Sequence, residues 1–167
     1  MSYSWTQKVF DQLTADSRTL ALAESCTGGL ACAEITSIAG ASKIFRGGII
    51  AYANAVKIQL LKVPEDLLEK KGPVSPEIAM AMAAGAKKRF GSDVAAAVTG
   101  LAGPGYGGGP DPLPVGTVWM AFVDDHRQEC LSEHFEGGRA AVRSSATKCL
   151  FHYLALFLSN DLPDRPA

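Results

Sequence analysis

Apolar and polar positions alternate along the chain with two different periods, which together predict short buried strands separated by amphipathic helices. Continuous apolar runs are typical of buried strands and occupy residues 19–23 and 94–99, and an apolar strand interrupted by Gly47 and Gly48 is expected at 45–52. Apolar residues three or four apart predict a first helix capped by Ser4 and later helices at about 30–39, 55–61, up to about 70, 75–91 and 139–158. Two more strands, 117–123 and 129–135, flank a polar turn and predict a hairpin.

This order of elements predicts an α/β fold. Strands alternate with helices over the first hundred residues and a hairpin follows, which indicates a three-layer α/β/α sandwich around a mixed β-sheet. The chain has 167 residues, a length that fits one domain, and it contains no repeat or linker. We therefore expect a single domain over residues 1–167, with its core at about 6–158.

Charge and composition narrow the possible functions. Sixteen Lys and Arg residues stand against 17 Asp and Glu residues, for a net charge of −1, whereas a nucleic-acid binder is usually far more basic. No segment approaches the roughly 18 consecutive apolar residues of a membrane span, and the N-terminus has no secretory pattern. We expect a cytoplasmic protein whose four cysteines are free thiols and which binds neither nucleic acid nor membrane.

The segment Glu24–Gly29 lies where a strand passes into a helix, and α/β sheets collect ligands at such points. Ser25 is a candidate nucleophile there. The glycines Gly28 and Gly29 allow close approach to the backbone, and free N–H groups at the helix start can bind an anion. The alternative is a tight turn in which Ser25 or Thr27 only caps the helix.

A nucleophilic serine needs a base, and none of the three histidines lies near a loop that would meet Ser25. Lys57 is a candidate, because partial burial lowers a lysine pKa. Tyr52 is expected to end the strand 45–52, so Tyr52, Asn54 and Lys57 place a phenol, an amide and an amine beyond that strand. The alternative for Lys57 is a solvated helix lysine.

Arg139 and Arg143 lie four residues apart at a glycine-flanked helix start, where the helix dipole disfavours positive charge. Two guanidinium groups beside free N–H groups would suit a phosphate. The alternative is an exposed pair that bridges Glu133 or Glu136.

Two further sequence patterns resemble a dinucleotide site and a metal site, and neither is expected to form one. Residues 103–108 match G-x-G-x-x-G, but Gly109–Pro112 follows where a dinucleotide site needs a helix, so a lid-like loop is the better interpretation. His126, Cys130 and His134 alternate along a predicted strand and lie too far apart to share one metal, so we expect no metal site.

Several motifs in one order resemble the CinA C-terminal domain family, the competence/damage-inducible group that includes stand-alone nicotinamide-nucleotide amidases. They span about residues 6–158 and comprise Ala23–Gly29, Arg46–Asn54 with Lys57, Gly72–Ser75, Thr99–Pro104, Pro114–Val118 and Gly138–Arg139 with Arg143. The resemblance implies deamidation of nicotinamide mononucleotide to nicotinic acid mononucleotide and ammonia, in the recycling of pyridine nucleotides towards NAD. It also implies an α/β/α fold with no cofactor or required metal. Longer members carry a domain in front, and we expect the single-domain form here.

The resemblance also implies roles for single residues. Ser25 would be the nucleophile, Lys57 the base that later protonates ammonia, and Tyr52 a residue that orients or relays the proton. Backbone N–H groups of Gly28–Gly29 or of Thr99–Gly100 would bind the oxyanion. Residues expected at the substrate are Thr27, Gly28, Gly29, Asn54, Thr99 and Gly100, with Arg139 and Arg143 at its phosphate.

Two other hypotheses stay open. A non-catalytic nucleotide-binding module could use the same pocket, and a cysteine hydrolase could use Cys26 as its nucleophile. We also expect a homo-oligomer. The Ala-rich helix face at 78–86 fits either a subunit interface or the core.

Overall fold

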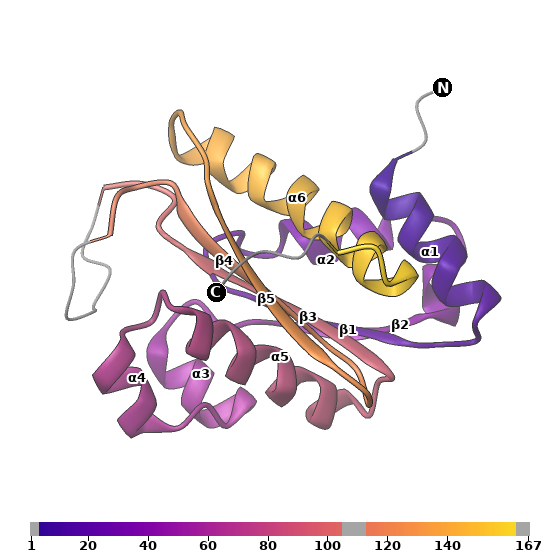
Figure 1. Cartoon of the computed structure of the whole chain (residues 1–167), viewed down its shortest axis with the longest axis horizontal. Helices are drawn as coiled ribbons and strands as arrows, with labels where there is room; N and C mark the ends of the chain where they lie inside the picture. Colours follow the sequence, from indigo (N-terminus) through magenta and orange to yellow (C-terminus); the bar gives the residue numbers. More distant parts are fainter. Residues whose placement is uncertain (1–3, 105–112, 163–167) are drawn as a thin grey trace.

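The computed structural model describes residues 4–104 and 113–162, which form a five-stranded sheet with helices on both faces (Figure 1). The first half of the chain contains α1 (Trp5–Ala15), β1 (Leu20–Glu24), α2 (Leu30–Thr36), the 3-10 turn η1 (Ala41–Lys43), β2 (Phe45–Ile50), α3 (Asn54–Leu61) and α4 (Glu65–Lys71). The second half contains α5 (Pro76–Phe90), β3 (Val94–Gly100), β4 (Thr117–Val123), β5 (Gln128–His134) and α6 (Arg139–Ser159).

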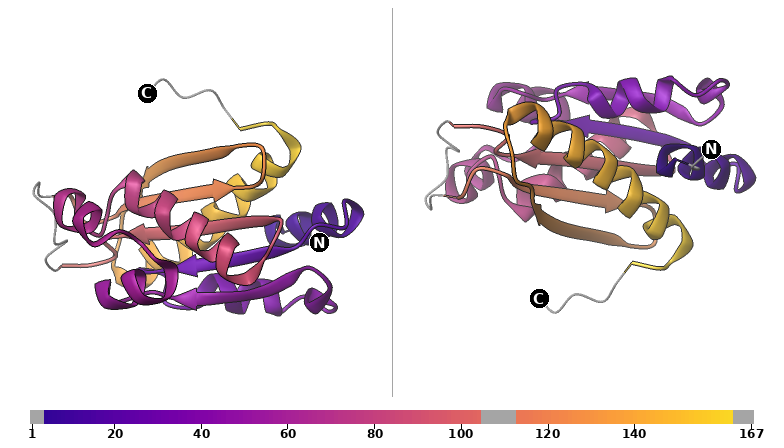
Figure 2. Two further views of the ribbon diagram at one scale, coloured as in Figure 1. Left: turned by 90° about the horizontal axis from the view of Figure 1, so that it is seen from below. Right: turned by 90° about the horizontal axis from the view of Figure 1, so that it is seen from above.

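The sheet is mixed, with strand order β2-β1-β3-β4-β5. β2, β1 and β3 are parallel, and β4 and β5 are antiparallel additions made by the hairpin. Helices α1, α2 and α6 cover one face and α3, α4 and α5 the other (Figures 1 and 2). The predicted three-layer α/β/α fold is therefore confirmed. Because the three parallel strands end at one edge, the loops after β1, β2 and β3 meet there.

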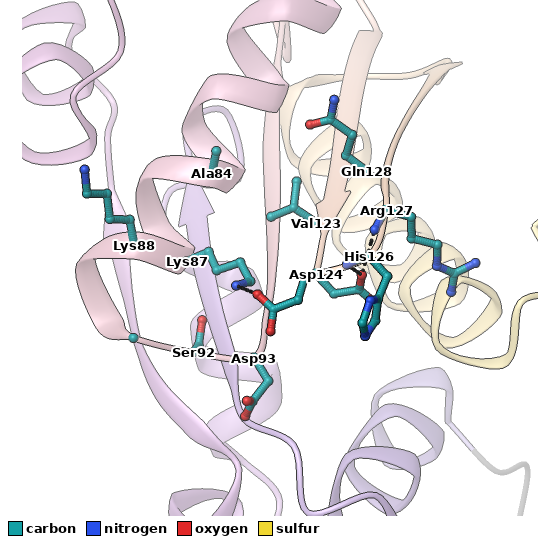
Figure 3. Close-up of a pocket in the computed structure, with 12 residues that line it drawn as sticks. Ala84, Lys87, Lys88, Ser92, Asp93, Val123, Asp124, His126, Arg127 and Gln128 are labelled. Atoms are coloured by element: carbon teal, nitrogen blue, oxygen red, sulfur yellow. Dashed lines mark hydrogen bonds and ion pairs between the residues drawn. The ribbon is translucent and has the colours of Figure 1, made fainter.

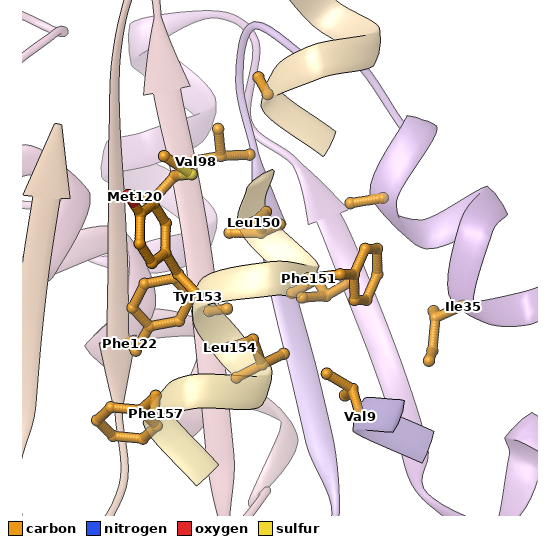
Figure 4. Packing of buried hydrophobic residues seen from close by; sticks show 14 of the residues in the cluster. Val9, Ile35, Val98, Met120, Phe122, Leu150, Phe151, Tyr153, Leu154 and Phe157 are labelled. Atoms are coloured by element: carbon orange, nitrogen blue, oxygen red, sulfur yellow. The ribbon is translucent and has the colours of Figure 1, made fainter. Parts of the chain in front are cut away.

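The face covered by α1, α2 and α6 holds the large side chains of the core. Alternate residues of β1, β3 and β4 point to it, among them Leu22, Val98 and Phe122, and they meet the buried stripe of α6. Figure 4 shows Phe122 and Met120 packed against Tyr153, Leu154 and Phe157 of this helix.

The opposite face is built mainly from small residues. β1 and β3 present Ala21, Ala23, Ala95 and Ala97 to the stripe of α5 that includes Ile78, Ala79, Met82, Ala83 and Ala86. Alanine on both sides lets α5 lie close to the sheet. The Ala-rich helix face at 78–86 is therefore used by the core of this chain.

Several boundaries differ from the prediction. α2 ends at Thr36 and not near residue 39, because the Thr36 and Ser37 hydroxyls donate to carbonyls of the preceding turn and compete with the helix. β2 ends at Ile50, so the prediction that Tyr52 ends this strand was wrong. Residues 105–112, which hold most of the G-x-G-x-x-G match, and 163–167 lie outside the described residues. No helix within the described ranges is long and apolar enough to span a bilayer.

Candidate active site

A cavity of about 530 Å³ opens at the edge where the parallel strands end. The segments that follow β1, β2 and β3 supply most of its wall, and the first residue of α6 closes one side. Seven of the site residues predicted from the sequence line this cavity: Ser25, Tyr52, Asn54, Lys57, Thr99, Gly100 and Arg139. Seven residues from four distant parts of the sequence are thus brought together at one point, the position at which open α/β sheets bind ligands.

Ser25 and Lys57 are in direct contact. Ser25 directly follows β1, and its N–H donates to Val98 O, which keeps it in line with the sheet. The Nζ atom of Lys57 lies 3.2 Å from Ser25 Oγ and 2.9 Å from Ala51 O. These contacts place a primary amine within hydrogen-bond reach of a serine hydroxyl.

Lys57 is one of the largest buried side chains in the protein, with 1% of its surface exposed. The solvated-lysine interpretation was therefore wrong. Burial lowers the pKa of Lys57 from 10.5 to about 8, because an apolar environment disfavours the charged amine, while the neighbouring Cys26 acts in the opposite direction. An amine with this pKa is available as a base near neutral pH.

Glu24, the residue before Ser25, is a buried carboxylate that sequence reasoning missed. It accepts hydrogen bonds from Thr27 Oγ1 at 2.6 Å and from the N–H groups of Gly29, Ala31 and Cys32. The capping role expected for Ser25 or Thr27 is therefore taken by Glu24, which satisfies the first turn of α2. An acid at the end of a wholly buried strand, just before a helix start, was the available signal.

This cap changes the role open to the start of α2. The N–H groups of Gly28–Gly29 were expected to bind an oxyanion. The N–H of Gly29 and those of Ala31 and Cys32 in the first turn of α2 donate to Glu24 instead. Gly28 and Gly29 both have positive φ, at 60° and 100°, so they are needed for the turn itself. Neither glycine lines the cavity, and Thr27 is fully buried behind it.

The two arginines predicted to act together are separated. Arg139 lines the cavity, and its Nη2 donates to Tyr52 Oη at 2.6 Å. Arg143 instead donates to Thr27 O at 2.7 Å and holds the turn that follows Ser25. Tyr52 meets Lys57 through its main-chain carbonyl, 3.5 Å from Nζ, while its phenol is directed to Arg139.

A second loop is fixed to the cavity wall by Thr99. Its Oγ1 donates to Pro73 O at 2.7 Å and so holds the Pro73–Val74 segment against the end of β3. Thr99 is fully buried, so its hydroxyl is a structural link and its backbone is what faces the cavity region. No role for the Pro73–Val74 segment was deduced from the sequence.

The Cys26 thiol is poorly suited to nucleophilic attack. It is almost completely buried, and burial raises its pKa to about 12, which keeps it protonated at neutral pH. This observation disfavours the cysteine-hydrolase hypothesis. Within residues 4–104 and 113–162, no group of three or more His, Cys, Asp or Glu side chains could hold a metal ion.

A second, larger cavity of about 830 Å³ lies at the opposite end of the sheet, between the end of α5 and the β4–β5 turn (Figure 3). Lys87 and Asp125 on its wall form an ion pair at 2.5 Å, and Asp124 pairs with Arg18 at 2.9 Å. Its buried serine, Ser92, donates to Val94 O. These side chains already bind one another, and no amine contacts a hydroxyl among the described residues there.

Sequence comparisons identify a family. A family model described as the CinA C-terminal domain matches residues 2–158. A CinA-like protein from Geotalea uraniireducens is 52% identical over 125 residues, which are 75% of this chain and 29% of that protein. Another, from Desulfotalea psychrophila, is 42% identical over 157 residues, or 94% of this chain and 38% of the relative. The chain spans about a third of the length of these relatives.

Solved structures of similar chains have the same fold. A competence-damaged protein (CinA) superfamily protein from Klebsiella pneumoniae matches with a TM-score of 0.88 and 31% identity, covering 93% of this chain and 96% of that one. A competence/damage inducible protein from Agrobacterium tumefaciens matches with a TM-score of 0.83 and 32% identity, covering 95% and 99%.

Proposed function

Because the chain belongs to the CinA C-terminal domain family, we propose that it is an amidase that hydrolyses the carboxamide of nicotinamide mononucleotide. Ser25 is the nucleophile in this proposal and Lys57 its base. The observation that carries the proposal is the buried amine of Lys57, 3.2 Å from the Ser25 hydroxyl on the wall of a cavity. A binding site has no need of such a pair, since a buried amine costs stability and a hydroxyl alone can bind polar groups.

The surroundings of Nζ favour the neutral amine as a proton acceptor. A neutral amine has two N–H donors and one lone pair. The carbonyls of Ala51 and Tyr52 lie 2.9 and 3.5 Å from Nζ and can accept the two donors. In the protonated lysine the third N–H donates to Ser25 Oγ; in the neutral amine that we propose as the base, the lone pair takes this place and accepts from the Ser25 hydroxyl.

The first half of the reaction forms an acyl-enzyme. Ser25 Oγ attacks the carboxamide carbon while its proton passes to Lys57 Nζ, giving a tetrahedral intermediate. The protonated Lys57 then donates that proton to the departing nitrogen. Ammonia leaves, an ester joins the pyridine acyl group to Ser25, and Lys57 is neutral again.

The second half releases the acid. Lys57 takes a proton from a water molecule, and the resulting hydroxide attacks the ester carbon. The ester bond breaks, and the proton returns from Lys57 to Ser25 Oγ. One amide and one water have then become one carboxylic acid and one ammonia, so the pair is restored without any further reactant.

The oxyanion needs N–H donors, and the geometry favours the end of β3 over the start of α2. Glu24 binds the donors of the α2 turn, as described above. Leu101 N donates to Thr117 O on β4, and N–H groups alternate in direction along a strand, so Gly100 N–H points to the β1 side, where Ser25 lies. Gly100 N–H is therefore the donor that we assign to the oxyanion.

Arg139 is the residue proposed to bind the phosphate. It is the charged side chain at the exposed end of the cavity wall, and none of the described residues that line the cavity is acidic. Tyr52 Oη, which now accepts from its Nη2, marks a position that a phosphate oxygen could take. Arg143 is left out of this role because its guanidinium holds Thr27 O.

The experiment is to incubate the purified protein with nicotinamide mononucleotide and follow ammonia and nicotinic acid mononucleotide. We expect product from the wild type, with turnover at least about 10³-fold lower in Ser25→Ala and about 10²–10⁴-fold lower in Lys57→Met. Substrate affinity should change much less than turnover. Ser92→Ala and Lys87→Met, a serine and a lysine from the second cavity, are matched controls expected to keep full activity.

Two results would contradict the proposal. Undiminished turnover in Ser25→Ala would exclude Ser25 as the nucleophile. Tight binding of the nucleotide with no product from the wild type would favour the non-catalytic binding module, and Arg139 would then be the first residue to test for binding.

A further inference from the structure

Gly85, in the middle of α5, lies directly against the end of α3. A Cβ atom added at Gly85 would collide with the carbonyl oxygen of Leu61 and lie 2.9 Å from its carbonyl carbon and 3.0 Å from its Cα. All three atoms belong to the backbone, so no change of rotamer could relieve the overlap. The missing side chain is therefore what allows the two helices to approach this closely.

Leu61 is tied to the catalytic lysine by the geometry of α3. Lys57 and Leu61 are four residues apart, so they lie on the same helix face, and they are the two buried residues of α3. The end of this helix is closed by hydrogen bonds from Lys62 N to Ile58 O and from Val63 N to Lys57 O, each 3.1 Å long. These hydrogen bonds hold α3 together as one short helix, so a displacement of Leu61 would also displace Lys57.

We propose that Gly85 is a positioning residue of the amidase site, which sets the distance between Lys57 and Ser25 by letting α3 rest on the backbone of α5. The inference rests on the proposed roles of Lys57 and Ser25. It assigns a function to a residue that does not line the cavity and carries no side chain.

The environment of Lys57 fixes the direction of the expected change. Burial is the main influence on the Lys57 pKa and lowers it, and the neighbouring Cys26 acts in the opposite direction. Tyr52 and Arg139 share the cavity wall, and Glu24 lies beyond Ser25. β3 carries no titratable side chain, and α5 has its own, Glu77, Lys87, Lys88 and Arg89, near its two ends. Moving α3 outward would solvate Nζ and raise the pKa towards 10.5.

Two explanations of Gly85 predict opposite results for Gly85→Ala. Alanine is the best helix former and glycine one of the worst, so helix propensity alone predicts a more stable protein with unchanged activity. Close contact with α3 predicts a less stable protein in which the amine has moved away from the hydroxyl. A displacement of about 1 Å in a catalytic group costs about 10²-fold in rate.

The test measures the Lys57 pKa directly, by NMR of protein labelled with 15N at the lysine Nζ atoms. The Lys57 signal is identified by its absence in Lys57→Met. We expect a higher Lys57 pKa in Gly85→Ala than in wild type, a kcat about 10²-fold lower at pH 7.5, and a KM within a few-fold. The pH profile of kcat should move to higher pH by the same amount as the lysine pKa.

Ala84→Gly is the matched control. Ala84 is the exposed neighbour of Gly85 on α5 and lines the second cavity, so this change destabilises the same helix without pressing on α3 (Figure 3). The Lys57 pKa and kcat should stay at their wild-type values. A shift of the same size in both variants would overturn the inference, because it would show a general effect of stability. A normal pKa and normal turnover in Gly85→Ala would also overturn it.

Should Gly85→Ala fail to fold, it can be rebuilt with Ser17→Gly. Ser17 has a positive φ of 54° at the end of α1, so glycine there relieves backbone strain far from the site. The lysine titration needs no substrate, which separates the two proposals. A shifted Lys57 pKa in a protein whose wild type releases no ammonia would reject the amidase and retain the positioning role.

Discussion

The two cavities, one at each end of the sheet, differ in how their charges are satisfied. The larger, of about 830 Å³, is lined by lysines, aspartates and an arginine, and the ion pairs Lys87–Asp125 and Arg18–Asp124 satisfy four of the charges around it. The smaller, of about 530 Å³, has a lysine with 1% exposure that contacts a hydroxyl and carbonyls and is bonded to no carboxylate of residues 4–104 and 113–162. The cavity proposed as the active site is therefore the smaller of the two.

The difference has a physical origin. Four charges around the larger cavity are paired, Lys87 with Asp125 and Arg18 with Asp124, so each of them has an opposite charge beside it. The lysine of the smaller cavity is buried and forms no ion pair within the described part of the chain, and burial lowers its pKa to about 8. A group held in an unfavourable state by the rest of the fold is a strong indication of function.

The strongest test of this contrast compares two acids. We expect Glu24→Gln to lower the free energy of unfolding by about 3 kcal/mol, because its NH2 group would face N–H donors that now bind a carboxylate. Turnover should fall as well, since Ser25 follows directly. Thermal unfolding and the ammonia assay measure both effects. The control is Glu34→Gln, which changes an exposed acid of α2 that accepts from Thr6 Oγ1 and should stay near wild type.

The second test is the pH dependence of the wild type. Lys57 must be neutral to accept a proton, and its pKa is about 8, so kcat/KM should rise about tenfold per pH unit below 8 and level off above 9. Activity at pH 6 should therefore be about 50-fold lower than at pH 8. A rate that falls over the same range, or does not change, would show that the reaction does not need neutral Lys57.

The third and smallest effect belongs to the larger cavity. Asp125→Asn breaks the ion pair with Lys87. The side chain of Asp125 is 69% exposed. We expect the free energy of unfolding to change by less than about 1 kcal/mol and turnover to remain that of the wild type. A large loss of turnover in this variant would remove the contrast between the two ends of the sheet.

Much of the fold follows from patterns that the sequence displays. The strands with unbroken apolar runs, the hairpin and the helix opened by Ser75–Pro76 were predicted within a few residues. The candidate pair Ser25 and Lys57 also followed from their positions beyond two strands. Boundaries failed where side chains compete with the backbone, as at Thr36, because such local hydrogen bonds leave no trace in the periodicity of apolar residues.

The remaining features depend on contacts between distant segments. A lysine in a short helix is expected to be exposed, but the fold brings Lys57 against Ser25 and Ala51, which follow two different strands, and buries it. The two arginines share a helix face, yet one contacts Tyr52, which follows β2, and the other contacts Thr27, which follows β1. Glu24 was passed over because its four donors come from the turn and the helix start that follow it, and that helix start was expected to bind an anion from outside.

The origin of Arg139 in the opposite helical layer has an evolutionary consequence. Ser25 and Lys57 come from the first two crossover units of the sheet, whereas Arg139 begins α6, which packs on the other face and follows the hairpin. Under the proposed chemistry, bond cleavage and recognition of the substrate's anionic end are encoded in separate stretches of the chain. Under this proposal, substitutions at Arg139 alone would change which anionic group is accepted and leave Ser25 and Lys57 unaltered, whereas Arg143 in the same helix also supports the turn after Ser25.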